Sequence, residues 1–315
     1  MNEYPSPVQT PDPSPSPEPP PPSHQPPKTS WMGPATLICS ALALILAGAA
    51  LYFVVSGGQE EPEPPPAPEP PPTFQYRDRT MTVLEGVPVN QYDASEFQLD
   101  STGRVVYEHN GVRAKTGVDV SFYQGEIDWQ AVAADGIDFA ILRLGYRGYT
   151  EGGLILDSHF LDNIRGALDA GLEVGVYFFS QALNPQEAEA EADFVALALE
   201  GYAITYPVAF DWEYISNPDA RTKNVTGEEL TQCAKAFCAR IQERGYTPAV
   251  YFNRDLAYLS YDLQELTQLP LWLAEYSSRP SFYYDFHLWQ YSDTGTVAGI
   301  QGNVDLDLDL RPLKP

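Results

Sequence analysis

Two carboxylates, Asp211 and Glu213, end the apolar segment Pro-Val-Ala-Phe-Asp-Trp-Glu at residues 207–213. A short apolar run of this kind predicts a buried parallel β-strand. Because residues i and i+2 of a strand share a face, the two carboxylates point the same way and Trp212 points the opposite way. Like charges at a buried strand end repel, so one of the two groups should hold a proton near neutral pH. A carboxylic acid beside a carboxylate is the arrangement that cleaves glycosidic bonds.

The pair also has a plain structural interpretation. Asp and Glu at a strand end are often the polar start of a loop, and Glu213 could cap the turn that follows. The strands and helices predicted around the pair distinguish the two interpretations.

Apolar strands alternate with helical segments from about Thr116 onward. The expected helices are 158–170, 185–199 and 227–244, and the connections after about residue 270 are short and lack clear helices. The expected strands are 117–121, 138–144, 173–179, 207–213, 248–252, 271–276, 287–291 and 303–307. This alternation predicts an α/β fold with a parallel sheet, an irregular (β/α) TIM-like barrel of about eight strands and five helices.

In such a barrel the active site lies at the carboxyl ends of the strands. Asp119 near the end of the first strand, Asp211 and Glu213 on the fourth, and Asp305 on the last would then converge on one mouth. Aromatic and polar side chains suit a sugar-binding opening. The substrate-binding candidates are Tyr123, Gln124, Arg143, Tyr177, Tyr251, Trp272, Glu275, Tyr276, Trp289 and Gln290.

An ordered set of segments resembles the family 25 glycoside hydrolases, the lysozymes of bacterial and phage origin. The similarity covers roughly residues 116–310. The segments are GVDVSFYQGEIDW (117–129), DGIDFAILRLGYR (135–147), AGLEVGVYFFS (170–180), YPVAFDWE (206–213), and then LWLAEY, LWQYS and GNVDLD.

The resemblance implies a muramidase that cleaves the β-1,4 bond between N-acetylmuramic acid and N-acetylglucosamine in peptidoglycan. It implies that Glu213 is the general acid and that Asp119, Asp211 and Asp305 are the other acids of the site. Asp211 would steady the transition state or the N-acetyl group of the substrate. One departure is Phe178, which follows Tyr177 where many relatives have His.

Three alternatives remain beside this interpretation. A chitinase-like family 18 hydrolase also has Asp-Trp-Glu-Tyr at a strand end, but its motif needs an Asp where this chain has Ala209. A metal-dependent phosphodiesterase could use clustered acids, but no His falls at a strand end except His287, at the start of its strand. A non-catalytic peptidoglycan-binding module would have no need to hold repelling carboxylates together.

The N-terminal part of the chain has a different composition. Twelve of the 30 prolines lie in residues 1–27, and 1–30 is expected to be a disordered tail. Residues 31–55 are uncharged and long enough to cross a bilayer. A Pro/Glu linker at 56–73 would extend about 50 Å in polyproline II geometry. A strand-rich lead-in at 74–113, with a hairpin at Asn110-Gly111, precedes the barrel domain at 114–315.

We interpret 31–55 as an uncleaved single-pass anchor rather than a signal peptide, because its apolar core is long and its leader is proline-rich and acidic. Lys28 before the span, and the lack of basic residues after it until Arg77, favour a cytoplasmic N-terminus and an extracellular enzyme. The net charge of −25 disfavours nucleic acid as a partner. We expect no metal or other cofactor, a monomeric catalytic domain, and peptidoglycan glycan strands as the partner.

Overall fold

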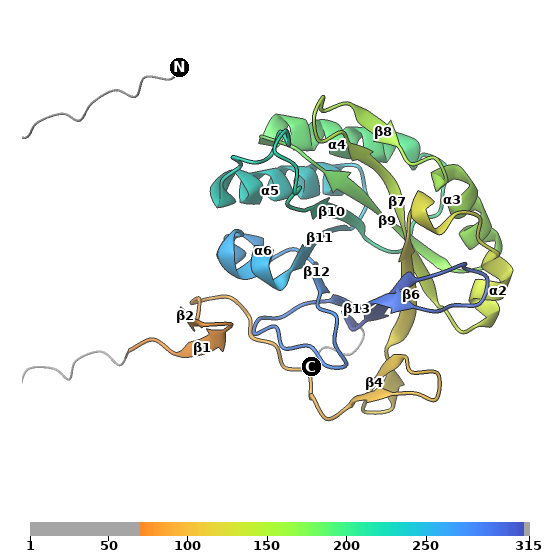
Figure 1. Ribbon diagram of the computed structural model, residues 1–315, viewed down its shortest axis with the longest axis horizontal. Coiled ribbons are helices and arrows are strands. Elements are labelled where there is room, and N and C mark those ends of the chain that lie inside the picture. The colour runs from red at the N-terminus through yellow and green to blue at the C-terminus, as the bar shows by residue number, and fades with distance from the viewer. Residues whose placement is uncertain (1–69, 312–315) are drawn as a thin grey trace, which may run out of the picture. The chain divides into compact units, whose positions relative to one another are not determined.

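The computed structural model describes residues 70–311 (Figure 1). The expected tail (1–30), membrane span (31–55) and most of the linker (56–73) lie outside these residues. Within the described range, no helix combines the length and the apolar character that crossing a membrane requires.

Eight strands close into a barrel, and the helices lie around its outside (Figure 1). Each strand coincides to within a few residues with one that the sequence predicts. A further strand, β8 (Leu154–Leu156), pairs with β7 only. The barrel strands are β6 (Lys115–Val120), β7 (Phe139–Arg147), β9 (Glu173–Ser180), β10 (Val208–Trp212), β11 (Pro248–Asn253), β12 (Leu271–Ala274), β13 (Leu288–Gly295) and β14 (Val304–Asp309).

The last strand departs from the expected parallel arrangement. Neighbouring strands from β6 to β13 pair in parallel, but β14 pairs antiparallel with both β13 and β6 and so closes the barrel. The physical reason is the short connection at 296–303, since a parallel crossover needs a dozen or more residues. The antiparallel direction places Asp305, near the start of β14, beside Asp119 near the end of β6.

The five α-helices of the described residues match the expected number, although the sequence located only three of them. Those three are α3 (Phe160–Asp169), α4 (Pro185–Ala198) and α5 (Gly227–Glu243). The Thr226 side chain and Glu229 form a capping box that starts α5. The remaining elements are α2 (Trp129–Ala134), α6 (Arg254–Leu259) and the 3-10 helices η1 (Phe122–Gln124) and η2 (Leu263–Leu266).

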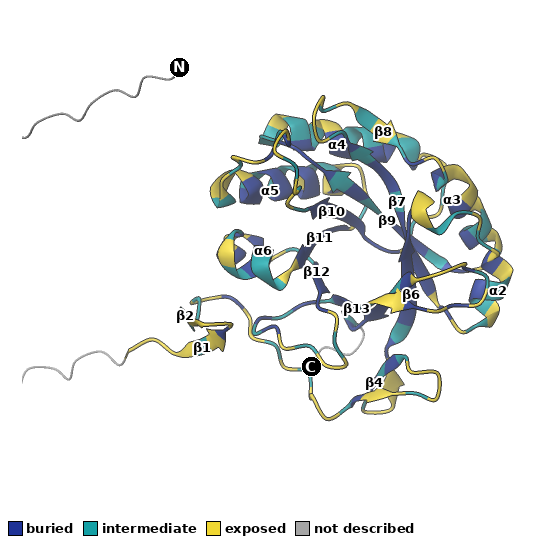
Figure 2. Cartoon of the chain, viewed as in Figure 1, coloured by how far each residue is buried: buried dark blue, intermediate teal, exposed yellow. Residues whose placement is uncertain are grey.

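Alternation along the strands produces two separate cores. The barrel strands themselves are mostly buried (Figure 2). Phe139, Tyr206, Tyr251 and Trp272 belong to the smaller core inside the barrel, and the larger core lies between the strands and the helices. Phe178 is fully buried in the larger core and contacts Phe194 of α4. The residue after Tyr177 therefore faces the helices, so its identity affects packing rather than the barrel mouth.

The lead-in packs onto the barrel and shares its core. Its strands are β1 (Thr73–Tyr76), β2 (Arg79–Thr82), β3 (Phe97–Leu99), β4 (Val105–His109) and β5 (Val112–Arg113). The predicted Asn110-Gly111 hairpin is confirmed, and both residues have the positive φ that a tight β-turn needs. Phe97 contacts Trp289 of β13 edge to face, with ring centroids 5.3 Å apart.

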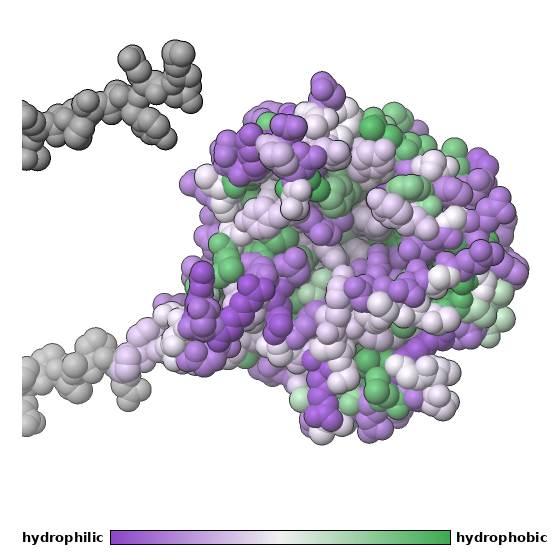
Figure 3. Space-filling model, viewed as in Figure 1, coloured by the Kyte–Doolittle hydropathy of each residue, from purple (hydrophilic) through white to green (hydrophobic). Residues whose placement is uncertain are grey.

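Hydrophilic residues cover much of the molecular surface that Figure 3 shows, and apolar residues form small groups on it.

We expect Phe97→Ala to lower the free energy of unfolding of the barrel by about 3–5 kcal/mol, because it empties a buried aromatic site. Leu99, on the same strand but 60% exposed, is the matched control, and Leu99→Ala should change stability by less than about 0.5 kcal/mol. Urea denaturation followed by tryptophan fluorescence measures both variants. An unshifted barrel transition in Phe97→Ala would mean that the lead-in folds independently.

Candidate active site

The four predicted acids lie at one end of the barrel. Asp119 and Asp305 are register partners across β6 and β14. Asp211 lies in β10, and Glu213 follows that strand directly. Burial and then the Glu213 charge raise the pKa of Asp211, and burial, the Asp293 charge and the Glu213 charge raise the pKa of Asp305. The acids of the three strands therefore lie close enough to interact. Trp212 lies on the opposite face of β10 in the outer core, as the strand alternation predicts.

Asp119 is held by a chain of directed hydrogen bonds. Gln290 Nε2 donates to Asp119 Oδ2 at 2.7 Å. The Oε1 atom of Gln290 accepts from the Tyr251 hydroxyl at 2.9 Å and from the Tyr276 hydroxyl at 3.1 Å. Because two hydroxyl groups donate to Oε1, the amide must present its N–H to Asp119. The orientation of the Asp119 carboxyl is therefore fixed by residues of β11, β13 and the loop after β12.

A fifth acid, Asp307, lies beneath Asp119 and was not among the predicted site residues. It is fully buried, and its Oδ1 accepts from the Trp272 indole N–H at 2.8 Å. Its Oδ2 meets no N–H donor, and its neighbour is the Asp119 carboxyl. Two carboxyl groups form a hydrogen bond only when one of them holds a proton. The Asp-Leu-Asp pattern at 305–307 was the available signal, since i and i+2 share a face of a strand.

Burial and neighbouring charge explain the protonation of this group of acids. Burial raises the pKa of Asp307 to about 8. Burial, and then the charges of Asp307 and Asp305, raise the pKa of Asp119 well above its usual range. The pKa of Asp305 rises to about 6 through burial and the Asp293 charge. Asp119 and Asp307 therefore share a proton at neutral pH.

We expect Asp307→Asn to keep hydrolytic activity within a few-fold of wild type at pH 7, because asparagine is a neutral donor to Asp119 and still accepts from Trp272. Asp307→Leu removes both hydrogen bonds. It leaves the buried Trp272 indole N–H without an acceptor, which costs about 1–3 kcal/mol of stability. Steady-state kinetics and thermal melts compare the two variants. Equal activity loss in both variants would exclude a role for the hydrogen bond between Asp307 and Asp119.

The second pair of acids is desolvated too. Burial, followed by the Glu213 charge, raises the pKa of Asp211 well above its usual range, while the Arg143 cation lowers it. Burial also raises the pKa of Glu213. The Oδ1 atom of Asp211 is buried without a hydrogen-bond partner. The two groups titrate together, and the Arg143 cation offsets part of the rise in the pKa of Asp211.

Several substrate-binding candidates lie at the mouth or directly below it. Tyr276 is about half exposed and lines a cleft together with Glu213, and Tyr123 is 76% exposed. Arg143 lies between the rings of Phe122 and Tyr146 and donates through Nε to Asp157 at 2.8 Å. The inner wall beneath the acids contains the side chains of Tyr177, Tyr251, Trp272 and Gln290.

Three candidates have structural roles instead. The prediction for Trp289 was wrong, because its side chain is fully buried on the outer face of β13 and donates to the Glu275 carbonyl. Gln124 caps η1 by accepting from the Ser121 N–H. The Glu275 carboxylate accepts from the N–H groups of Ser281 and Phe282 and from the Ser281 hydroxyl. Strand alternation in β13 could have placed Trp289 outward once Gln290 was placed inward.

The sequence interpretation also missed Gln181, which follows β9 directly. Its Nε2 donates to the Glu213 carbonyl at 3.2 Å, and its Oε1 accepts from the Thr222 hydroxyl. Gln181 thereby fixes the start of the loop that carries Glu213. A polar residue directly after a barrel strand was the available signal.

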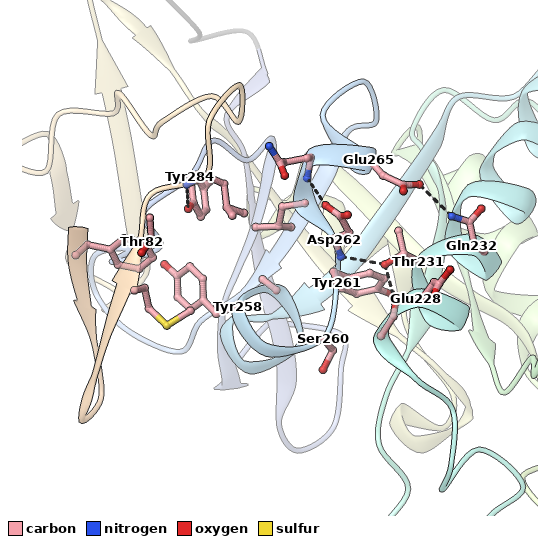
Figure 4. Close-up of a pocket in the computed structure, with 17 residues that line it drawn as sticks. Thr82, Glu228, Thr231, Gln232, Tyr258, Ser260, Tyr261, Asp262, Glu265 and Tyr284 are labelled. Atoms are coloured by element: carbon pink, nitrogen blue, oxygen red, sulfur yellow. Dashed lines mark hydrogen bonds between the residues drawn. The ribbon is translucent and has the colours of Figure 1, made fainter. Parts of the chain in front are cut away.

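Glu213 lines a cleft of about 360 Å³. Other residues of its lining are Tyr251, Asn253, Glu275 and Tyr276. A larger pocket of about 610 Å³ lies elsewhere, between β2, the start of α5 and the segment after α6 (Figure 4). In its lining the Asp262 N–H donates to Thr231 Oγ1. We place the chemistry in the smaller cleft, because Glu213 lines it.

An α/β barrel with coupled buried carboxyl groups at its mouth is the architecture of a glycoside hydrolase. Residues 118–300 match the family of glycosyl hydrolases family 25, and the chain belongs to this family.

Two curated relatives are similar over the same region. The autolytic lysozyme of Clostridium acetobutylicum is 29% identical over 192 residues, which are 61% of this chain and 54% of the relative. Lysozyme M1 of Streptomyces globisporus is 30% identical over 203 residues, 60% of this chain and 65% of the relative. The chain therefore spans less than two thirds of the length of these relatives.

A solved structure with a similar fold is the modular autolysin LytC of Streptococcus pneumoniae, in complex with a synthetic peptidoglycan ligand. The TM-score is 0.56 at 24% identity, over 73% of this chain and 53% of that one.

Proposed function

We propose that this protein is a peptidoglycan hydrolase of the muramidase type. It cleaves the β-1,4 bond between N-acetylmuramic acid and N-acetylglucosamine in bacterial cell walls. The observation that carries the proposal is the desolvated Asp211–Glu213 pair at the mouth of a family 25 barrel. The names of the two curated lysozymes add support.

In this mechanism Glu213 donates its proton to the glycosidic oxygen as the bond to the anomeric carbon breaks. Burial keeps Glu213 protonated at a pH where an exposed glutamate is ionised. Asp211, ionised beside Arg143, stabilises the positive charge that develops on the sugar or on its N-acetyl group. Water then adds to the anomeric carbon, and its proton returns to Glu213. The products are two shorter glycans, one with a new reducing end.

A non-catalytic wall-binding module fits the site less well. Burying five acids at one end of a barrel costs stability, because each charge is desolvated and repels the next. A module that only binds gains nothing from that cost. Ala209 at the barrel interior stands where the chitinase-like alternative needs a third acid.

Analysis of the product ends tests the proposal. Purified peptidoglycan is digested with the protein, reduced with borohydride and examined by mass spectrometry. We expect reduced N-acetylmuramic acid at the new ends. Reduced N-acetylglucosamine would reject the muramidase assignment, and an unchanged wall would favour the binding module.

We also propose that residues 31–55 anchor the protein as a single span, with a cytoplasmic N-terminus, an extracellular enzyme and a monomeric catalytic domain. The uncharged sequence and the single Lys28 before it support this topology. Carbonate-resistant membrane association of the full chain, lost when 1–55 is deleted, is the expected result. Release of the full chain by carbonate would contradict the anchor.

A further inference from the structure

The cleft beside Glu213 has a wall that comes in part from outside the family-matched region. Tyr76 and Arg77, at the tip of the β1–β2 hairpin, line it together with Arg254 and Asp255 from α6. The hairpin precedes residue 118, where the family match begins. The lead-in therefore contributes two residues to this wall.

The hairpin is held against the barrel by specific contacts. The Tyr76 hydroxyl donates to Asp255 Oδ1 at 2.8 Å, and Arg77 Nη2 lies 2.5 Å from Asp255 Oδ2. Phe74 stacks on Tyr283, with ring centroids 4.4 Å apart. These contacts fix the hairpin tip beside the cleft.

Two guanidinium groups gather around one ring at this end of the cleft. The Cζ atoms of Arg77 and Arg254 each lie 5.5 Å from the centroid of the Tyr76 ring. They are the cationic residues of the cleft lining, which also contains Glu213, Asp255 and Glu275. The positive charge of the cleft is thus carried by the two residues beside the Tyr76 ring.

Each arginine has one carboxylate partner, and each of these carboxylates also accepts from other donors. Arg254 Nη1 also donates to the Ser281 hydroxyl. Both oxygens of Asp255 are already used by Tyr76 and Arg77. The Glu275 carboxylate, 3.2 Å from Arg254, also accepts from two backbone N–H groups and one hydroxyl. The Arg77 side chain is 63% exposed and uses one of its five N–H donors in these contacts.

The backbone at Arg77 gives an independent reason to assign a role to this residue. Its φ is +53°, in the left-handed region that side chains other than Gly, Asn and Asp rarely adopt. Glycine or asparagine would form this turn at lower cost. Strained backbone conformations of this kind cluster at active sites and ligand-binding sites.

We propose that Arg77 and Arg254 form a subsite for a carboxylate of the peptide stem on the wall glycan. The inference rests on the proposed function. A guanidinium pairs with a planar carboxylate through two parallel hydrogen bonds. Glycan hydroxyl and acetamido groups are neutral, so the carboxylates of such a substrate belong to its peptide stems. The subsite selects glycan that still carries stems and positions it with the scissile bond at Glu213.

The test compares two substrates for the full-length protein: stem-bearing glycan strands, and the same strands after carbodiimide and methylamine have converted the stem carboxylates to neutral amides. We expect wild type to prefer the untreated strands by about tenfold in kcat/KM. The preference should become smaller at 0.5 M NaCl, because salt screens exposed charge pairs. Arg77→Asn keeps a residue that tolerates the turn and should raise KM about tenfold on the untreated strands only.

Arg79→Asn is the matched control, since Arg79 is an exposed arginine of the same hairpin outside the cleft. It should leave both KM values within twofold. Arg77→Lys should give an intermediate value, because it keeps the charge without the bidentate geometry. Arg254→Gln provides a second variant if Arg77→Asn is poorly folded.

Equal loss on both substrates in Arg77→Asn would show that Arg77 only docks the hairpin, which would overturn the subsite. Absence of a substrate preference in wild type would also overturn it. A wild type that cleaves neither substrate would instead reject the proposed function, so the two failures are distinguishable.

Discussion

Glu213→Gln is expected to lower kcat on purified cell walls by about 10²–10⁴-fold, because glutamine cannot donate a proton to the glycosidic oxygen. The fold should remain intact. Glutamine has nearly the same shape, and the change removes a buried acid that repels Asp211. Turbidity clearing of wall suspensions measures the rate, and circular dichroism with a thermal melt confirms the fold.

Glu200→Gln is the control for this variant. Glu200 is exposed in the connection between α4 and β10, at the opposite end of β10 from Glu213. Its replacement should leave the clearing rate within experimental error. If Glu213→Gln clears walls as fast as wild type, the assignment of the general acid is wrong.

Arg147→Met is expected to lower the free energy of unfolding by about 3–5 kcal/mol at pH 8, because it leaves a buried carboxylate without its partner. Arg147 Nε donates to Glu191 Oε1 at 2.6 Å, and the Ser180 hydroxyl donates to Glu191 Oε2 at 2.6 Å. The side chains of both charged residues are almost completely buried. Together they join the ends of β7 and β9 to α4.

The effect should depend on pH in a defined direction. Burial raises the pKa of Glu191 from 4.5 to about 7 in spite of Arg147. Between these values the folded state binds more protons than the unfolded state, so this group's contribution to stability falls as pH rises. Removing Arg147 raises the folded pKa further. The stability gap between wild type and Arg147→Met should therefore widen from pH 5 to pH 8.

Urea denaturation at pH 5 and pH 8 measures this gap. The double variant Arg147→Met/Glu191→Gln has no buried charge at either position. Its loss in free energy of unfolding should therefore be smaller than that of Arg147→Met and should not depend on the ionisation of Glu191. If Arg147→Met loses the same free energy of unfolding relative to wild type at both pH values, the buried-charge explanation is wrong.

The local elements were predictable where a periodic pattern is long enough to be read. The eight barrel strands and the helices α3, α4 and α5 follow from apolar runs and amphipathic segments. The helices α2 and α6 have six residues each and show less than two full turns of a periodic pattern. Sequence reasoning missed both of them for that reason.

The candidate site was predictable as far as one strand could determine it. The i, i+2 rule placed Asp211 and Glu213 on one face and Trp212 on the other. The same rule applies to Asp305 and Asp307, yet the depth of each in the barrel depends on the register between β14 and β6. Register is set by closure of the sheet, which no single segment encodes.

The sequence by itself determined the barrel class, the family and the acids that meet at its mouth, because strand periodicity and motif order are local properties of the chain. Only the tertiary structure decided the reversed direction of β14, the outward position of Trp289, the burial of Asp307 beside Asp119 and the placement of Arg77 beside the cleft. Each of these depends on which segments distant in sequence pack together, and packing is selected by the burial and hydrogen bonding of the whole fold.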